Sequence, residues 1–170
     1  YVAWLVKKYG LRPLAVHFDN GWNSELAVSN ITEVLARLRI DLHTHVVNWE
    51  EFRDIQRAFF MASVPNIEIP TDHAITAVFH EQAFKHGIKY IINGGNIRSE
   101  GLYPKSWGWY NFDLKHLNAL HKKFGRVKRT ETMPKIGIYK FAWNTIIRRI
   151  KTIPILNYVN YSKSEAMNLL

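Results

Sequence analysis

The sequence contains no cysteine, which excludes disulfide bonds, cysteine-ligated zinc and thiolate chemistry within these 170 residues. It has no uninterrupted apolar run near the roughly 20 residues that a membrane-spanning helix needs. No signal peptide is visible at its start, and internal repeats and low-complexity tracts are missing too. We therefore expect a protein without a membrane span, located in the cytoplasm.

What the sequence does contain indicates a folded protein with anionic partners. Apolar residues make up 47% of the chain and aromatic residues 14%, which is typical of a globular domain with a real core. The formal net charge is +9. Such a charge favours phosphates, nucleic acid or a membrane surface as partners without choosing among them.

Short β-type runs alternate with helical patterns in the first hundred residues. The expected strands are residues 13–18, 42–47 and 90–93, and the expected helices are residues 1–9, 23–38, 49–62 and 71–86. Strands that alternate with helices indicate a parallel sheet with crossover helices. The prediction is an α/β fold with a doubly wound, Rossmann-like parallel sheet.

The composition of the sequence changes after Gly101. We therefore predict two units: an α/β domain at residues 1–101 and a mostly helical, substrate-shaping extension at residues 102–170. Helices are expected at 113–124 and 136–151. The second has an apolar stripe that we expect to dock on the core, with its basic side in water; contact with a membrane surface is the alternative. The stripe consists of Tyr139, Trp143, Ile146, Ile147 and Ile150.

Polar residues follow two of the expected strands. Asp19–Trp22 comes after the first, and Gly94–Asn96, with Glu100, comes after the third. Ligands bind at the carboxyl ends of strands in open α/β sheets, and glycine lets a backbone approach a phosphate closely. Glu100 could hold Mg²⁺ there. The alternative is an ordinary turn with a solvated carboxylate.

Several segments together resemble a known family. They are residues 11–25, 48–52, 72–74, 86–96, 107–108, 121–125 and 161–166. The chain resembles the N-acetyl sugar amidotransferases of bacterial surface-polysaccharide (lipopolysaccharide O-antigen) synthesis, which have the PP-loop ATP pyrophosphatase fold. The resemblance extends over nearly the whole sequence.

The resemblance also implies a missing piece. The Ser-Gly-Gly-x-Asp-Ser phosphate loop of such enzymes, with the first strand of the sheet, is expected just before Tyr1 and is not in this sequence. The chain opens in an uncapped helical pattern, and a capping box at Ser162–Glu165 begins a helix at its other end. We interpret the sequence as an internal fragment, and predict poor solubility for residues 1–170 alone.

The resemblance implies an ATP-dependent reaction. ATP would adenylate the acetamido oxygen of a nucleotide-linked N-acetyl sugar, and ammonia would then replace AMP to give an acetamidino group. Mg²⁺ would neutralise the phosphate charge. Ammonia would come from a glutaminase–synthase pair resembling the imidazole glycerol phosphate synthase subunits of histidine biosynthesis. This chain lacks the cysteine that glutaminases use as nucleophile.

The same resemblance assigns the nucleotide-binding residues. His17 and Phe18 would contact adenine through backbone groups, at the end of the first expected strand. Gly94, Gly95 and Asn96 would line the phosphates or the ribose.

The candidate catalytic residues are Asp19, near ATP or the reacting amide, and Asp72 and His73, facing the sugar or the amide. Glu100 is the candidate Mg²⁺ ligand. Each has a structural alternative: Asp19 ends its strand in an Asx-turn, Asp72 caps a helix, and His73 packs in the core or faces solvent.

Four alternatives remain open. A tRNA-modifying PP-loop enzyme suits the charge, but such enzymes usually use cysteine and no RNA-binding module is apparent, so nucleic acid is not expected. An NAD-synthetase-like enzyme and a non-catalytic nucleotide-binding module are two more. A doubly wound domain without ATP chemistry is also possible, because a fold does not fix a function.

Overall fold

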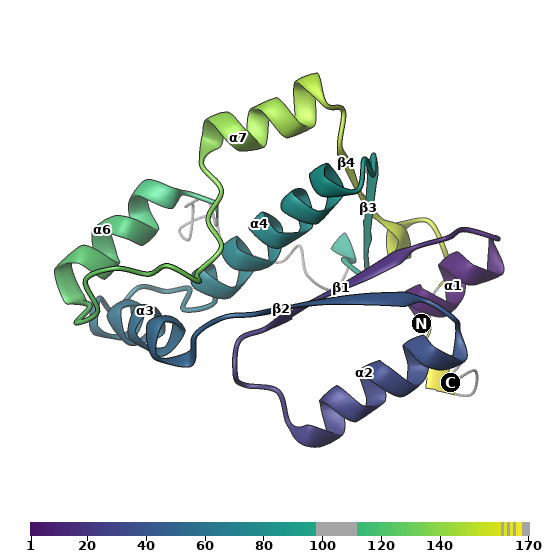
Figure 1. The fold of residues 1–170 in the computed structure, drawn as a ribbon, viewed down its shortest axis with the longest axis horizontal. Coiled ribbons are helices and arrows are strands. Elements are labelled where there is room, and N and C mark those ends of the chain that lie inside the picture. Colours follow the sequence, from purple (N-terminus) through teal and green to yellow (C-terminus); the bar gives the residue numbers. More distant parts are fainter. Residues whose placement is uncertain (98–111, 161, 163, 165, 168–170) are drawn as a thin grey trace.

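Two short parallel sheets organise the chain (Figure 1). The computed structural model describes residues 1–97, 112–160, 162, 164, 166 and 167. β1 (Leu14–Asp19) pairs with β2 (Asp41–Val46), and β3 (Tyr90–Asn93) pairs with β4 (Lys151–Pro154). The helices are α1 (Val2–Lys8), α2 (Glu25–Arg37), α3 (Trp49–Met61), α4 (Ile69–Lys85), α6 (Leu114–Phe124) and α7 (Ile138–Ala142), with a π-helical turn at Trp143–Ile147 and a 3₁₀ turn at Ile155–Asn157.

The first sheet forms as the sequence predicts. β1 and β2 run in register from Leu14 opposite Asp41 to Asp19 opposite Val46. Parallel neighbours need a crossover, which α2 supplies. The hydroxyl of Ser24 caps α2 by accepting a hydrogen bond of 3.2 Å from the Ala27 N–H.

The main core lies where α3, α4 and α6 meet β1. Phe52, Ile55 and Phe59 of α3 are fully buried there, together with Phe18, Val78 and Leu117. Phe60, which directly follows Phe59, is 60% exposed. Positions 52, 55 and 59 share one face of a helix, whereas residue 60 lies a further 100° around it.

Helix α4 begins earlier in the chain than predicted, since its start was expected at residue 71 or 72. Its N-cap is Glu68, and Pro70 lies in the first turn. Proline is favoured there, because the N–H that it lacks has no partner inside a helix. Asp72 is therefore inside the first turn and is not the cap.

The described residues do not form a single doubly wound sheet. They form a mixed α/β structure with two separate two-stranded parallel sheets. The sequence analysis did not predict β4, since it placed residues up to 151 in a helix. β4 belongs to the predicted extension yet pairs with β3, from Tyr90 opposite Lys151 to Asn93 opposite Pro154. The extension thus contributes a strand beside the first unit.

The orientation of α7 is the reverse of the prediction. The stripe expected to dock on the core faces outward, with Tyr139 90% exposed and Ile146 70% exposed, and within it only Ile150 is buried. The opposite side of the helix makes the contacts: Asn144 is buried, and the Arg148 guanidinium lies 3.8 Å from the centre of the Phe84 ring. Within the described part of the chain, every helix is too short or too polar to cross a membrane.

Candidate functional site

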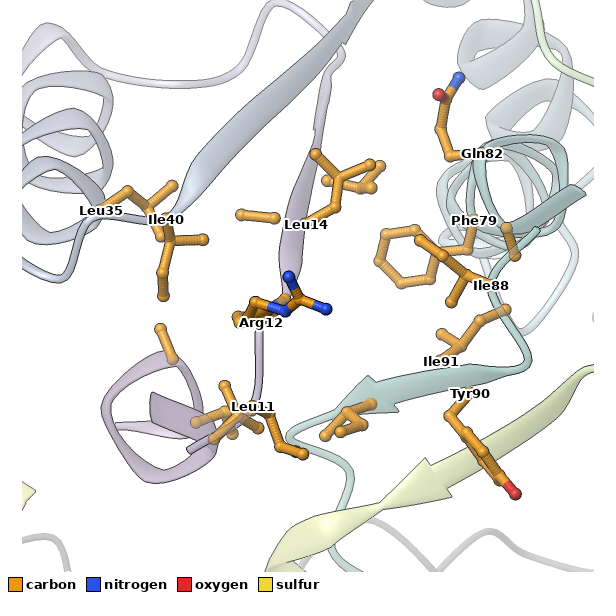
Figure 2. A pocket seen from close by; sticks show the side chains of 18 residues that line it. Leu11, Arg12, Leu14, Leu35, Ile40, Phe79, Gln82, Ile88, Tyr90 and Ile91 are labelled. Carbon is orange, nitrogen blue, oxygen red and sulfur yellow. The ribbon is translucent and has the colours of Figure 1, made fainter. Parts of the chain in front are cut away.

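An apolar cavity of about 430 Å³ separates the two sheets (Figure 2). Leu14, Ala15 and Val16 of β1 line one side, and Ile91 and Ile92 of β3 line another. The remaining walls come mainly from α1 and α4. The two sheets therefore meet across a space that is lined by side chains typical of a protein core.

Helix α1 connects two edges of this space. A Cβ built on Gly94, directly after β3, would lie 3.5 Å from a methyl carbon of Val2, so α1 starts beside the carboxyl end of β3. α1 ends at Lys8, and Gly10, with a φ of +72°, turns the chain toward the amino end of β1. This path matches the second half of a strand–helix–strand crossover between parallel strands.

The carboxyl end of β1 is a rigid polar turn. Asp19 Oδ1 accepts hydrogen bonds from the Gly21 N–H (3.0 Å) and from Asn23 Nδ2 (3.1 Å). The same Asn23 nitrogen lies 3.4 Å from His17 Nε2. The bond from the Gly21 N–H holds the pKa of Asp19 below its ordinary value, so this carboxylate is ionised at neutral pH. The Asx-turn interpretation of Asp19 is confirmed; its catalytic role stays a prediction.

The loop after β1 is anchored on α3. Trp22 Nε1 donates a 2.8 Å hydrogen bond to Gln56 Oε1, and the Trp22 ring meets Trp49 edge-on, with centroids 5.3 Å apart. Gly21 has a φ of +82°, and a Cβ there would lie 2.7 Å from Trp49 Cε3. Glycine is therefore required here by both conformation and space. Neither Asn23 nor Gln56 was expected at the site, because their partners Asp19 and Trp22 are recognisable only in the folded structure.

Phe18 can offer a ligand little besides its backbone. Its ring is buried in the core and meets Phe52 edge-on at 5.7 Å. The predicted contact with adenine through backbone groups of His17 and Phe18 is compatible with this geometry and stays a prediction.

The segment after β3 is also held in a defined turn. The Gly95 N–H donates to Asn93 Oδ1 (3.1 Å), and the Ile97 N–H donates to Asn157 Oδ1 (2.9 Å). Gly94, Gly95 and Asn96 thus lie between α1 and the 3₁₀ turn that contains Asn157. Asn157 could not be found from the sequence, since it is 60 positions from its partner. Glu100, the candidate Mg²⁺ ligand, lies outside the described residues.

His73 does not face an open site. It is fully buried, and its Nε2 accepts a 3.2 Å hydrogen bond from the Ile136 N–H. Burial, with a smaller contribution from the positive charge of Lys135, lowers the pKa of His73, so the ring is neutral. The core interpretation describes this residue better than the catalytic one. Asp72, its neighbour in the first turn of α4, is half-buried.

The described residues do not form a metal site by themselves. Among them, no group of three His, Cys, Asp or Glu side chains is close enough together to hold a metal ion. Mg²⁺ in nucleotide sites needs one or two carboxylates and takes its other ligands from phosphates and water.

Comparisons of this chain with protein-family models, with curated proteins and with solved structures found no match. The resemblance to the amidotransferases therefore stays a prediction.

Proposed function

We propose that this chain belongs to an ATP-dependent N-acetyl sugar amidotransferase with a PP-loop-type fold. The observation that carries the proposal is the apolar cavity between β1 and β3, with α1 starting at one edge of it. One additional parallel strand, preceding Tyr1, would fill this space and lead directly into α1.

The added strand would join the two small sheets in the order β2–β1–new strand–β3–β4. The facing edges of β1 and β3 would then find partners for their backbone N–H and C=O groups. Figure 1 shows α2 on one side of the β1–β2 ribbon and α4 on the other, as a doubly wound sheet requires. The strand order would reverse between the new strand and β3.

That reversal point is where ligands bind in doubly wound sheets. The turn at Gly94–Asn96 follows β3, which borders that point, and the turn at Asp19–Asn23 follows β1, on the other side of the new strand. We assign the backbone of Gly94–Asn96 to the nucleotide, Asp19 to the phosphate side of the site, and the missing loop to the phosphates themselves. A bound Mg²⁺ would supply positive charge to the phosphates.

The reaction must activate the acetamido oxygen, which is a poor leaving group. The acetamido oxygen attacks the α-phosphorus of ATP, and pyrophosphate leaves. Ammonia then adds to the imidate carbon, and AMP leaves with the original oxygen, so that an acetamidino group and a proton remain. Enzymes stabilise a phosphoryl group during its transfer mainly by positioning it and by electrostatic interactions. A site built from backbone turns can provide both.

Pyrophosphate release by the full-length protein tests this function. The assay contains ATP, Mg²⁺ and ammonium, with or without a UDP-linked N-acetyl sugar. We expect release that depends on the sugar, and a product about one mass unit lighter because NH replaces O. Release that needs tRNA would instead identify an RNA-modifying enzyme. ATP binding without release in any mixture would leave a nucleotide-binding module.

Asp19→Asn tests the assigned site in that assay. We expect kcat/KM to fall about tenfold or more, because the change removes a negative charge near the phosphates and metal while asparagine keeps the turn acceptor for the Gly21 N–H. Asp41→Asn is the matched control, since Asp41 is exposed at the amino end of β2. Equal activity of both variants would remove Asp19 from the site.

The added strand is tested separately from the activity. We expect the 170-residue chain to bind an apolar dye such as anilinonaphthalene sulfonate and to unfold without a sharp transition. Extending it upstream through the missing strand should reduce dye binding and raise the Tm, whereas a Gly/Ser extension of equal length should do neither. A sharp transition and weak dye binding by residues 1–170 alone would contradict the added strand.

A further inference from the structure

The outer side of α7 concentrates exposed apolar side chains. Tyr139, Trp143 and Ile146 follow one another at helical spacing, and each is more than half exposed. We call this the α7 surface; it consists of Ile138, Tyr139, Trp143, Ile146 and Ile147, with the exposed basic residues Lys140 and Arg149 beside them. Large contiguous apolar patches of this kind mark sites of contact with another surface.

The helix is fixed in this orientation by its other side. The His80 and Phe141 rings lie 4.9 Å apart, and Arg148 stacks on Phe84. The carbonyl oxygen of Arg148 also accepts a 2.9 Å hydrogen bond from Lys89 Nζ. The apolar stripe therefore cannot turn inward without breaking these contacts.

The distribution of charge along the chain indicates which kind of partner binds the α7 surface. Residues 114–160 contain eleven Lys and Arg residues and one acidic residue, Glu131. This excess exceeds the net charge of the whole chain, so the net positive charge comes from this part of the sequence, and basic and acidic residues nearly balance elsewhere. Figure 1 shows α6 and α7 on the same side of the molecule, away from α2. An anionic partner would be attracted to that side.

We propose that the α7 surface docks on the surface of an anionic lipid bilayer. Helices that lie in the membrane interface combine Trp and large aliphatic residues with Lys and Arg, as this one does. The apolar side chains would enter the boundary between head groups and acyl chains, while Lys140 and Arg149 would stay at the level of the anionic head groups.

Two other occupants fit less well. Nucleic acid would use the basic charge and the rings of Tyr139 and Trp143, but the three isoleucines of the α7 surface have no flat ring for stacking on bases and would stay exposed to water. A second copy would bring the same basic surface against itself in a symmetric dimer, which like charge opposes.

The test is flotation of the full-length protein with vesicles. Vesicles of phosphatidylglycerol mixed with phosphatidylcholine should bind the protein, and pure phosphatidylcholine vesicles should bind much less. About 0.5 M salt should weaken the binding, since it screens the charges. The double variant W143A/I146A should lower the bound fraction about tenfold or more, because it removes two of the largest inserted groups.

The matched control is L26A/F60A, which truncates two side chains of similar exposure on α2 and α3. It should bind like the original chain, and circular dichroism should show that both variants keep their helices. Equal binding to neutral and anionic vesicles, or no loss in W143A/I146A, would overturn the proposal. So would self-association or binding to poly(U) RNA that depends on Trp143 in the absence of any vesicle binding.

Discussion

Phe52→Ala is expected to lower the free energy of unfolding by about 3–5 kcal/mol. The Phe52 side chain is fully buried in the core cluster, where it contacts the ring of Phe18 on β1. Truncation removes apolar burial and leaves a cavity between α3 and the first sheet. A loss of this size is a large part of the roughly 5–15 kcal/mol that stabilises a typical domain.

Urea unfolding of the full-length protein, followed by far-ultraviolet circular dichroism, measures this effect. Phe60→Ala is the matched control, because Phe60 belongs to the same helix but is 60% exposed. We expect the control to change the free energy of unfolding by less than about 0.5 kcal/mol. Similar losses in both variants would mean that α3 does not present Phe52 to the core.

Asp54→Ala is expected to lower the free energy of unfolding by a comparable amount, about 3–5 kcal/mol. Asp54 Oδ2 accepts hydrogen bonds from the Arg126 N–H (2.7 Å), the Val127 N–H (2.9 Å) and His121 Nε2 (3.1 Å). This one carboxylate ties α3 to the end of α6 and the segment after it. Its removal leaves three donors without their acceptor in a poorly hydrated place.

The matched control is Glu50→Ala, one turn earlier on α3, where the side chain is exposed. The measurement is the urea midpoint of each variant. A small loss for Asp54→Ala, equal to that of the control, would show that the carboxylate does not hold the two segments together.

The Asp54 interaction also predicts how stability depends on pH. Burial by itself would raise the pKa of Asp54, but the hydrogen bonds from Val127, Arg126 and His121 outweigh it and hold the pKa below its ordinary value. The stabilisation is therefore complete above the unfolded pKa of about 3.9 and is lost as the pH falls through the lower folded pKa. The stability difference between the original chain and Asp54→Asn should shrink below about pH 4.

Local patterns in the sequence were enough to find most of the elements. The strands at 14–19, 41–46 and 90–93 lie within one residue of the predicted 13–18, 42–47 and 90–93, because short β-type runs end at turn residues. The helix N-caps at Ser24 and Asp113 also depend on nearby residues alone, because a short polar side chain can accept a hydrogen bond from an N–H two or three positions ahead. The turn at Asp19 belongs to this group too.

Elements that depend on distant partners were mispredicted or missed. β4 was not expected, because residues 151–154 become a strand only when β3 lies beside them. Apolar spacing predicted a docked stripe on α7, but the contacts of Phe141 and Arg148 with α4 turn that stripe outward. Periodicity identifies the apolar side of a helix and does not say which side meets the core.

The sequence by itself determined the alternation of strands and helices, the positive charge and the turns that follow β1 and β3. These depend on backbone conformation and hydrogen bonds within a few residues. The tertiary structure alone decided that His73 is buried against Ile136, that Asp54 joins segments some 70 positions apart, and that an apolar space lies between β1 and β3. The physical reason is that burial and long-range pairing depend on all the elements packed around a residue, which no local stretch of sequence encodes.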